Sequence, residues 1–249
     1  VLPLNSNWKG LPDTLETETL EIPNYSALAA QNQGALRFNT ENTAHYITDY
    51  QGILLEQILD AITDLDSTSK LQVVQERRLL AEAGSIPFAD LVPVIEKLTE
   101  ETSYLVVSGV KAVLNGLKLF VDEGSECEKA YHELVVKLSK FNFDRLGFEA
   151  KEGESDEDEL VRQIVVGGLI AADDQTASQE ASRIFAAHKE DLEKLPAAIR
   201  LHILINQIKH DESKELADQY LNDYVSTVDG SFKRQLASAL AYTKDAETL

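Results

Sequence analysis

Residues 146–162 read LGFEAKEGESDEDELVR, and this stretch contains signals for the end of one helix and the start of another. Gly147 suits the left-handed backbone conformation that often closes a helix. Ser155 is a preferred residue type for capping the next helix. The four acidic residues at 156–159 then fall in the first turn, where the helix dipole favours negative charge. The stretch therefore predicts a helix end, a solvated loop and a strongly marked helix start.

Outward from this stretch, apolar residues recur with a helical period from residue 49 to the end of the chain. The longest apolar stripe covers residues 106–121. Between the stripes stand pairs of residues that commonly start or stop helices, namely Asp66-Ser67, Gly84-Ser85, Gly124-Ser125, Asp173-Asp174, Leu195-Pro196 and Asp229-Gly230. This pattern predicts about ten helices, most of them short and joined by tight connections.

The number of helices indicates the fold class. Consecutive amphipathic helices with short links favour antiparallel neighbours, and ten of them are too many for one bundle. We therefore expect a mainly α chain with a HEAT-like α-solenoid over residues 46–249, although no strict repeat is visible in the letters. Such an array presents a concave face, where a binding function is expected.

The first 45 residues have a different texture, rich in Pro, Asn and Thr. Short extended patterns at residues 1–4, 17–22 and 35–39 predict strands, each bounded by turn-forming residues. Three short strands do not make a stable sheet by themselves, and nothing later in the chain has a strand pattern. The chain also begins with Val1 and contains no Met. We therefore expect a fragment whose opening segment pairs with strands outside it.

The charge of the chain bounds its partners. The net charge is −20, from 43 acidic and 23 basic side chains, and a duplex or an anionic membrane would repel such a surface. We therefore expect no nucleic-acid partner and no membrane partner. We also expect a soluble chain, because no apolar run approaches membrane-spanning length. Two interpretations of the acidity stay open: a highly soluble surface, or an acidic wall that selects basic ligands.

Cys127 is the only cysteine, so the chain forms no internal disulfide, which fits a reducing, cytoplasmic compartment. Cys127 also falls on an apolar helical stripe with Tyr131, Leu134 and Leu138. This position predicts a buried structural thiol rather than a nucleophile.

The histidines do not have the spacing of a metal site. His132-Glu133 begins a pattern like the zinc motif His-Glu-x-x-His, but Val136 stands where the second histidine is needed. We therefore expect His132 to be a surface or boundary side chain. The four other histidines are scattered over different expected elements and are predicted to be ordinary surface or helix-end residues: His45, His188, His202 and His210.

Other candidate motifs also favour structural roles. The acidic run at 152–159 does not match a calcium-binding EF-hand loop. Gly167-Gly168 lies within an expected helix with no strand before it, so we expect it to admit a neighbouring helix rather than bind phosphate. We expect Arg162 to pair with Asp158 or Glu159 on the helix surface. The sequence therefore predicts no catalytic, cofactor-binding or metal-binding residues in this chain.

Several motifs occur in the order found in one known family. Leu-Gly-Phe at 146–148, Gly-Glu-Ser at 153–155 and Leu-Val-Arg at 160–162 are accompanied by Leu-Arg-Phe-Asn at 36–39 and Pro-Ala-Ala-Ile-Arg at 196–200. Trp8-Lys9-Gly10 and the helix end Leu-Ala-Glu-Ala-Gly at 80–84 agree as well. Together they cover nearly the whole chain and resemble the C-terminal region of zinc aminopeptidases of the aminopeptidase N family, in the bacterial, lactic-type form.

The resemblance implies a domain organisation and a function. Residues 1–45 would be the C-terminal end of a β-sandwich domain, and residues 46–249 a helical cap domain truncated at its C-terminus. The parent would be a cytoplasmic metallopeptidase, a hydrolase that removes N-terminal residues from peptides with zinc held in an upstream catalytic domain. This chain would contact that catalytic domain and peptide substrates, control peptide access, and be inactive alone. The alternative is a free-standing α-solenoid scaffold that binds a peptide or protein on its concave face.

Overall fold

Capping residues begin helices in the structure as the sequence predicts. In the computed structural model, which describes residues 1–211 and 214–243, five side chains accept a hydrogen bond from the first turn of a helix: Asp66, Ser125, Ser155, Asp174 and Asp229. Gly147 closes a helix with a φ of 60°. Local capping chemistry therefore marks the start of these five helices.

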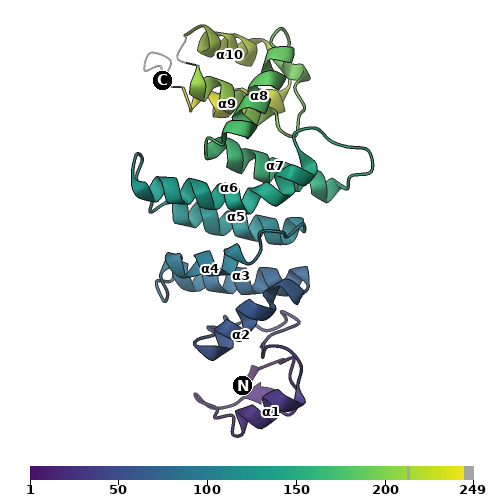
Figure 1. Ribbon diagram of the computed structural model, residues 1–249, viewed down its shortest axis with the longest axis vertical. Coiled ribbons are helices and arrows are strands. Elements are labelled where there is room, and N and C mark those ends of the chain that lie inside the picture. Colours follow the sequence, from purple (N-terminus) through teal and green to yellow (C-terminus); the bar gives the residue numbers. More distant parts are fainter. Residues whose placement is uncertain (212–213, 244–249) are drawn as a thin grey trace. The chain divides into compact units, whose positions relative to one another are not determined.

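The described residues form eleven α-helices and one pair of two-residue strands (Figure 1). This composition confirms the predicted mainly α fold. The strands are β1 (Leu2–Pro3) and β2 (Thr14–Leu15). The helices are α1 (Tyr25–Gln31), α2 (Ile53–Ala61), α3 (Ser67–Glu82), α4 (Val92–Glu96), α5 (Tyr104–Lys118), α6 (Glu126–Leu146), α7 (Asp156–Ala171), α8 (Gln175–Ala187), α9 (Arg200–His210), α10 (Lys214–Ser226) and α11 (Gly230–Leu240). Residues 244–249 of the predicted helical domain lie outside the described part.

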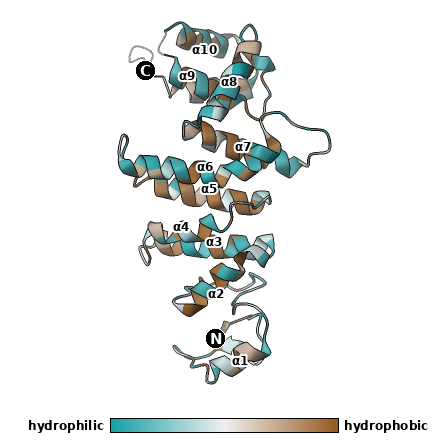
Figure 2. Cartoon of the chain, viewed as in Figure 1, coloured by the Kyte–Doolittle hydropathy of each residue, from teal (hydrophilic) through white to brown (hydrophobic). Residues whose placement is uncertain are grey.

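The chain divides into two compact units by its internal contacts. The first contains Val1–Leu98 and Gly109–Leu119, and the second contains Thr99–Ser108 and Phe120–Leu249. In the second unit α6 packs on α7, α8 on α9, and α10 on α11. Its core is formed by apolar side chains from α7 to α11 together with Phe148. Figure 2 shows hydrophobic and hydrophilic residues on the same helices, as expected of amphipathic helices that bury one face. No helix in the described ranges has the length and apolar character needed to cross a membrane.

The opening segment contains less β structure than predicted. β1 pairs with β2 in antiparallel fashion, with Leu2 opposite Leu15. The strand predicted at 17–22 is wrong, because the Thr17 hydroxyl donates to the Thr19 carbonyl at 2.6 Å and forms a local turn. Residues 25–31, where no element is predicted, form the helix α1.

The strand predicted at 35–39 is also wrong, although this segment does run beside the start of the chain. The Asn39 amide donates to the Leu4 carbonyl at 2.9 Å, but the Arg37 amide donates to the side chain of Asn7 instead of to a backbone carbonyl. Asn5 and Asn39 both have left-handed backbone conformations, with φ of 45° and 53°. These two residues turn the backbone out of the extended conformation, so a regular ladder does not form.

Cys127 is exposed, so the prediction of a buried thiol is wrong. The buried residues of α6 begin only at Val135, so the first turns of this helix, which contain Cys127, lie at the surface. The apolar stripe is real, but packing covers only its C-terminal part.

The small residues of α7 admit two neighbouring helices, as predicted. A Cβ atom at Gly168 would lie 3.3 Å from side-chain atoms of Ser139 and Val135 on α6. A Cβ atom at Gly167 would lie 2.5 Å from the Cε1 atom of His202 on α9. The two glycines therefore allow close approach on two sides of one helix.

Arg162 is a buried residue and not the surface residue that the sequence predicts. Its side chain is 2 % exposed and pairs with Glu154 in the loop before α7, not with Asp158 or Glu159. Asp158 instead pairs with Arg145 at the end of α6 and completes a capping box with Ser155. The two ion pairs fasten the acidic loop between α6 and α7.

Asp158 is expected to make stability depend on pH. Hydrogen bonds from Arg145 and from the Ser155 amide lower the pKa of Asp158 to about 2. A carboxyl group whose pKa is lowered by folding stabilises the folded state above its unfolded pKa, and this contribution is lost as the pH falls through the folded pKa. We therefore expect Asp158→Asn to lower the free energy of unfolding by about 1–2 kcal/mol at pH 7, and by less as the pH falls from 4 toward 2.

Denaturant unfolding at pH 7 and pH 3 measures this difference. Asp144→Asn is a suitable control, because Asp144 pairs with Lys140 on the exposed surface of α6 and its change should matter little. A difference for Asp158→Asn that is equal at both pH values would contradict the prediction.

Candidate functional site

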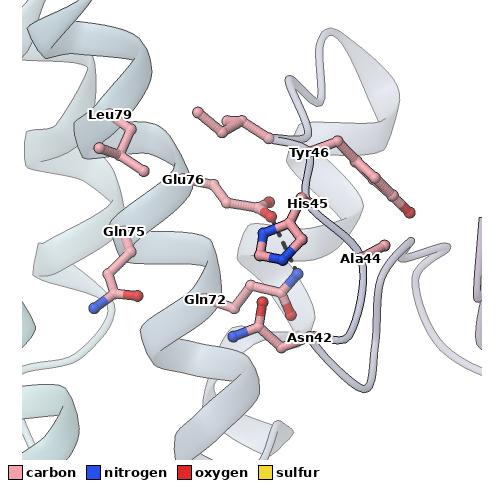
Figure 3. A pocket seen from close by; sticks show the side chains of 9 residues that line it. Asn42, Ala44, His45, Tyr46, Gln72, Gln75, Glu76 and Leu79 are labelled. Carbon is pink, nitrogen blue, oxygen red and sulfur yellow. Dashed lines mark hydrogen bonds between the residues drawn. The ribbon is translucent and has the colours of Figure 1, made fainter. Parts of the chain in front are cut away.

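An open cavity of about 480 Å³ lies in the first unit between α3 and the loop that follows residue 41 (Figure 3). We call it the α3 pocket. Both walls carry polar side chains, and Ile47 and Leu79 add exposed apolar surface. It is lined by Asn42, Ala44, His45, Tyr46, Ile47, Gln72, Gln75, Glu76 and Leu79.

The helix wall of the α3 pocket follows from the spacing of its residues. Gln72, Gln75, Glu76 and Leu79 are three, four and seven residues apart, so they share one face of α3. Figure 3 shows the Gln72 and Glu76 side chains reaching from this helix toward the loop. The start of α3 is fixed by Asp66, whose side chain accepts from the Ser69 amide at 3.0 Å. This cap sets the register with which the polar face meets the loop.

The loop wall is held by side chains that replace strand pairing. The buried Asn39 side chain donates to the Ala44 carbonyl and accepts from the Ala44 amide, both at 2.9 Å. The Tyr46 hydroxyl donates to the Leu4 carbonyl at 2.7 Å. These bonds satisfy backbone groups that have no strand partner and fix the loop opposite α3.

Glu76 is the most unusual group of the pocket. It is 8 % exposed, and its carboxylate accepts a hydrogen bond from Gln72 Nε2 at 3.1 Å. Burial raises the pKa of Glu76 above its ordinary value, while hydrogen bonds from Gln72 and Thr48 act against that rise. The neighbouring Arg77 is used elsewhere, because it pairs with Asp49 at 3.5 Å and donates to the Tyr50 carbonyl. Among the described residues no Lys, Arg or His forms an ion pair with Glu76.

The negative charge of Glu76 also acts on nearby tyrosines. Burial raises the pKa of Tyr46, and the charge of Glu76 raises it further. Burial likewise raises the pKa of Tyr50 to about 12, against a hydrogen bond that its hydroxyl accepts from the Phe38 amide at 2.7 Å. The charge of Glu76 therefore raises the pKa values of both tyrosines, whereas the charge of Arg37 lowers that of Tyr50.

The residue types of the α3 pocket are suited to binding polar groups. Its lining contains a carboxylate, an imidazole and three amides, but no Ser, Thr or Cys side chain that would act as a nucleophile. Nowhere in the described ranges do three His, Cys, Asp or Glu side chains converge as a metal site. The arrangement is suited to hold a cationic or hydrogen-bonding group.

The histidines occupy separate places in the fold. His45 lines the α3 pocket, and His132 is half-buried on α6 as expected of a boundary residue. His188 and His210 lie at helix ends, as predicted, where His188 Nδ1 is 2.9 Å from the Ile184 carbonyl. His202 also lies at a helix end, in the first turn of α9, and its partly buried ring packs against Gly167 because that glycine leaves room for it.

Sequence reasoning missed Gln72 and Glu76 as candidate site residues. A signal for them exists in the letters, since a polar face at 72, 75 and 76 continues into the apolar Leu79 on one side of the helix. That pattern is ordinary for a solvated helix face. Only the loop at 42–47, about thirty residues earlier, converts it into a pocket.

Comparison with known proteins identifies the family. The sequence model of the ERAP1-like C-terminal domain matches residues 36–249. The chain belongs to this family. The chain is also similar to longer proteins. It is 53 % identical over 249 residues to an Aminopeptidase N of Lactococcus lactis subsp. lactis. It is 35 % identical over 244 residues to an Aminopeptidase N of Lactobacillus helveticus. Aminopeptidase M1-B of Oryza sativa subsp. japonica is 24 % identical over 233 residues.

The chain matches these two bacterial relatives over nearly its whole length but spans less than a third of theirs. The match to the Lactococcus relative includes 100 % of this chain and 29 % of that protein, and the Lactobacillus match includes 98 % and 29 %. The resemblance to the C-terminal region of a lactic-type aminopeptidase N is therefore confirmed. The predicted division of the chain at residue 45 stays a prediction.

Proposed function

We propose that this chain is the non-catalytic C-terminal part of a zinc-dependent aminopeptidase that removes N-terminal residues from peptides. The observation that carries the proposal is the match of all 249 residues to an Aminopeptidase N of which they make up 29 %. The described residues do not fit a zinc ion, because no three suitable ligands converge among them. We therefore assign zinc and the bond-breaking groups to a catalytic domain elsewhere in the same polypeptide.

We further propose that the helical part, residues 46–249, caps the active site and controls the access of peptides. The net charge of −20 supports this role, because an acidic surface raises the local concentration of peptides with positively charged amino termini. The single cysteine supports a cytoplasmic location. The alternative of a free-standing scaffold accounts for the helices but not for the match over the whole chain to aminopeptidase N.

The first test is the activity of the 249-residue chain alone. We expect purified chain, supplied with zinc, to release no measurable p-nitroaniline from aminoacyl p-nitroanilides. The full aminopeptidase N of Lactococcus lactis, assayed in parallel, is the positive control. Metal-dependent hydrolysis by the 249-residue chain would overturn the proposal that the chain is non-catalytic.

The second test concerns the cap role and uses the full polypeptide. Removal of the helical part should change the ratio of kcat/KM values between a ten-residue peptide and a dipeptide amide, because access control acts on the longer substrate. The zinc content of the truncated protein shows whether its catalytic domain is still folded. An unchanged ratio in a zinc-loaded protein would contradict the cap role.

A further inference from the structure

We propose that the α3 pocket binds the basic side chain of a peptide, with its ammonium or guanidinium group against the Glu76 carboxylate. This inference does not rest on the aminopeptidase function, because it concerns a site wholly within the first unit. One open interpretation of the acidic surface is that it selects basic ligands, and the α3 pocket would be the site of that selection.

The first argument is the uncompensated charge of Glu76. A buried carboxylate is costly unless it is paired, and the groups that donate hydrogen bonds to Glu76, from Gln72 and Thr48, are neutral. The adjacent cation, Arg77, already pairs with Asp49 and Tyr50. A ligand cation would therefore supply a charge-assisted hydrogen bond that the described residues do not.

The second argument is the distribution of polar and apolar groups in the cavity. Glu76 and Gln72 are both at most 8 % exposed, whereas Ile47 is 48 % and Leu79 is 39 % exposed. The Glu76 carboxylate and the neighbouring Gln72 amide thus lie deep, and two apolar side chains lie near the opening. Lysine and arginine have the matching form, since their aliphatic stems cover apolar surface while the charged end reaches polar partners.

The third argument is that the pocket suits an organic cation better than an anion or a metal ion. Anions are disfavoured, because the carboxylate of Glu76 and the net charge of −20 repel them. A metal ion is disfavoured because no group of three ligands is present in the described part of the chain. An organic cation with a long stem needs only one carboxylate and a few amide oxygens, which Glu76, Gln72 and Asn42 provide.

Titration of the 249-residue chain with three capped tripeptides tests the proposal. The peptides are acetyl-Ala-Lys-Ala-amide, acetyl-Ala-Arg-Ala-amide and acetyl-Ala-norleucine-Ala-amide, the last with the stem but no charge. We expect saturable binding of the lysine and arginine peptides, followed by isothermal titration and by amide chemical shifts. Binding of the norleucine peptide should be weaker by about tenfold or more, as the loss of a charge-assisted hydrogen bond implies.

Two variants locate the site. Glu76→Gln keeps the hydrogen bond from Gln72 and should weaken binding of the lysine peptide by about tenfold or more. Gln75→Lys changes an exposed lining residue, does not disturb the buried carboxylate, and should weaken binding by placing a competing cation at the opening. Glu56→Gln, an exposed residue of α2 outside the pocket, changes the net charge equally and should leave the affinity within about twofold.

Several results would overturn the proposal. These are equal affinity for the lysine and norleucine peptides, no saturable binding of either cationic peptide at millimolar concentration, and chemical-shift changes that fall outside the α3 pocket. Unchanged affinity in both Glu76→Gln and Gln75→Lys would do the same. Circular dichroism of each variant confirms that it is folded before its affinity is compared.

Discussion

Replacing Arg162 with methionine is expected to lower the free energy of unfolding by about 3–5 kcal/mol. Methionine keeps most of the buried volume but removes the guanidinium group that pairs with Glu154. The Arg162 side chain is 2 % exposed and that of Glu154 is 15 % exposed, so the remaining carboxylate cannot be fully hydrated. The hydrogen bond from Arg162 also holds the pKa of Glu154 below its ordinary value, and this effect is lost with the arginine.

Chemical denaturation at pH 7 measures the effect of Arg162→Met. The matched control is Arg183→Met, which removes a guanidinium group that pairs with Glu180 on the exposed surface of α8. This control should cost less than about 1 kcal/mol, because exposed ion pairs contribute little. The double variant Arg162→Met with Glu154→Gln should recover part of the loss, since no unpaired charge then remains. Equal effects of Arg162→Met and Arg183→Met would show that burial of the pair does not matter.

Replacing Gly167 with alanine is expected to lower the free energy of unfolding by about 2–3 kcal/mol. In an open helix position the same change would stabilise the protein by about 1 kcal/mol, because alanine favours the helix. At Gly167 the new Cβ atom would lie 2.5 Å from Cε1 and 2.9 Å from Nε2 of His202, so α7 and α9 must move apart or the imidazole must leave its place. The cost of the overlap therefore exceeds the gain in helix propensity.

Thermal and chemical unfolding of a double-mutant cycle test this explanation. His202→Ala removes the ring that meets the new methyl group, so Gly167→Ala should cost much less in that background. Gly230→Ala is the control, because no atom lies within 4 Å of a Cβ at that position of α11. If Gly167→Ala is equally destabilising with and without His202, the overlap with the ring is not its cause.

The sequence predicts many of the helices of this chain well because residues close to their ends determine where they begin and end. Ser155 caps α7 and Gly147 closes α6, and both roles need only a few neighbouring residues. The partner of Arg162 was predicted wrongly for the opposite reason. The choice between Asp158 and Glu154 depends on the path of the loop before α7, which brings Arg145 to Asp158 and leaves Glu154 for Arg162.

The candidate site could not be predicted from sequence by the same logic. The burial of Glu76 results from a loop that belongs to a different part of the chain, and that loop is shaped by Asn39 and Tyr46 rather than by a regular strand. The failed strand at 35–39 and the missed pocket thus have one cause. Hydrogen bonds from side-chain amides and hydroxyls replace backbone pairing in this loop, and no periodic pattern in the sequence predicts such bonds.

Few other residues can replace Asn39, because its position requires both a left-handed backbone and a side chain that donates and accepts hydrogen bonds. Its backbone has a left-handed conformation. Its side-chain amide donates a hydrogen bond to the Ala44 carbonyl and accepts one from the Ala44 backbone amide. Glycine tolerates the conformation but offers neither bond, and aspartate can only accept. A carboxylate at this position would therefore face the Ala44 carbonyl oxygen and loosen one wall of the cavity.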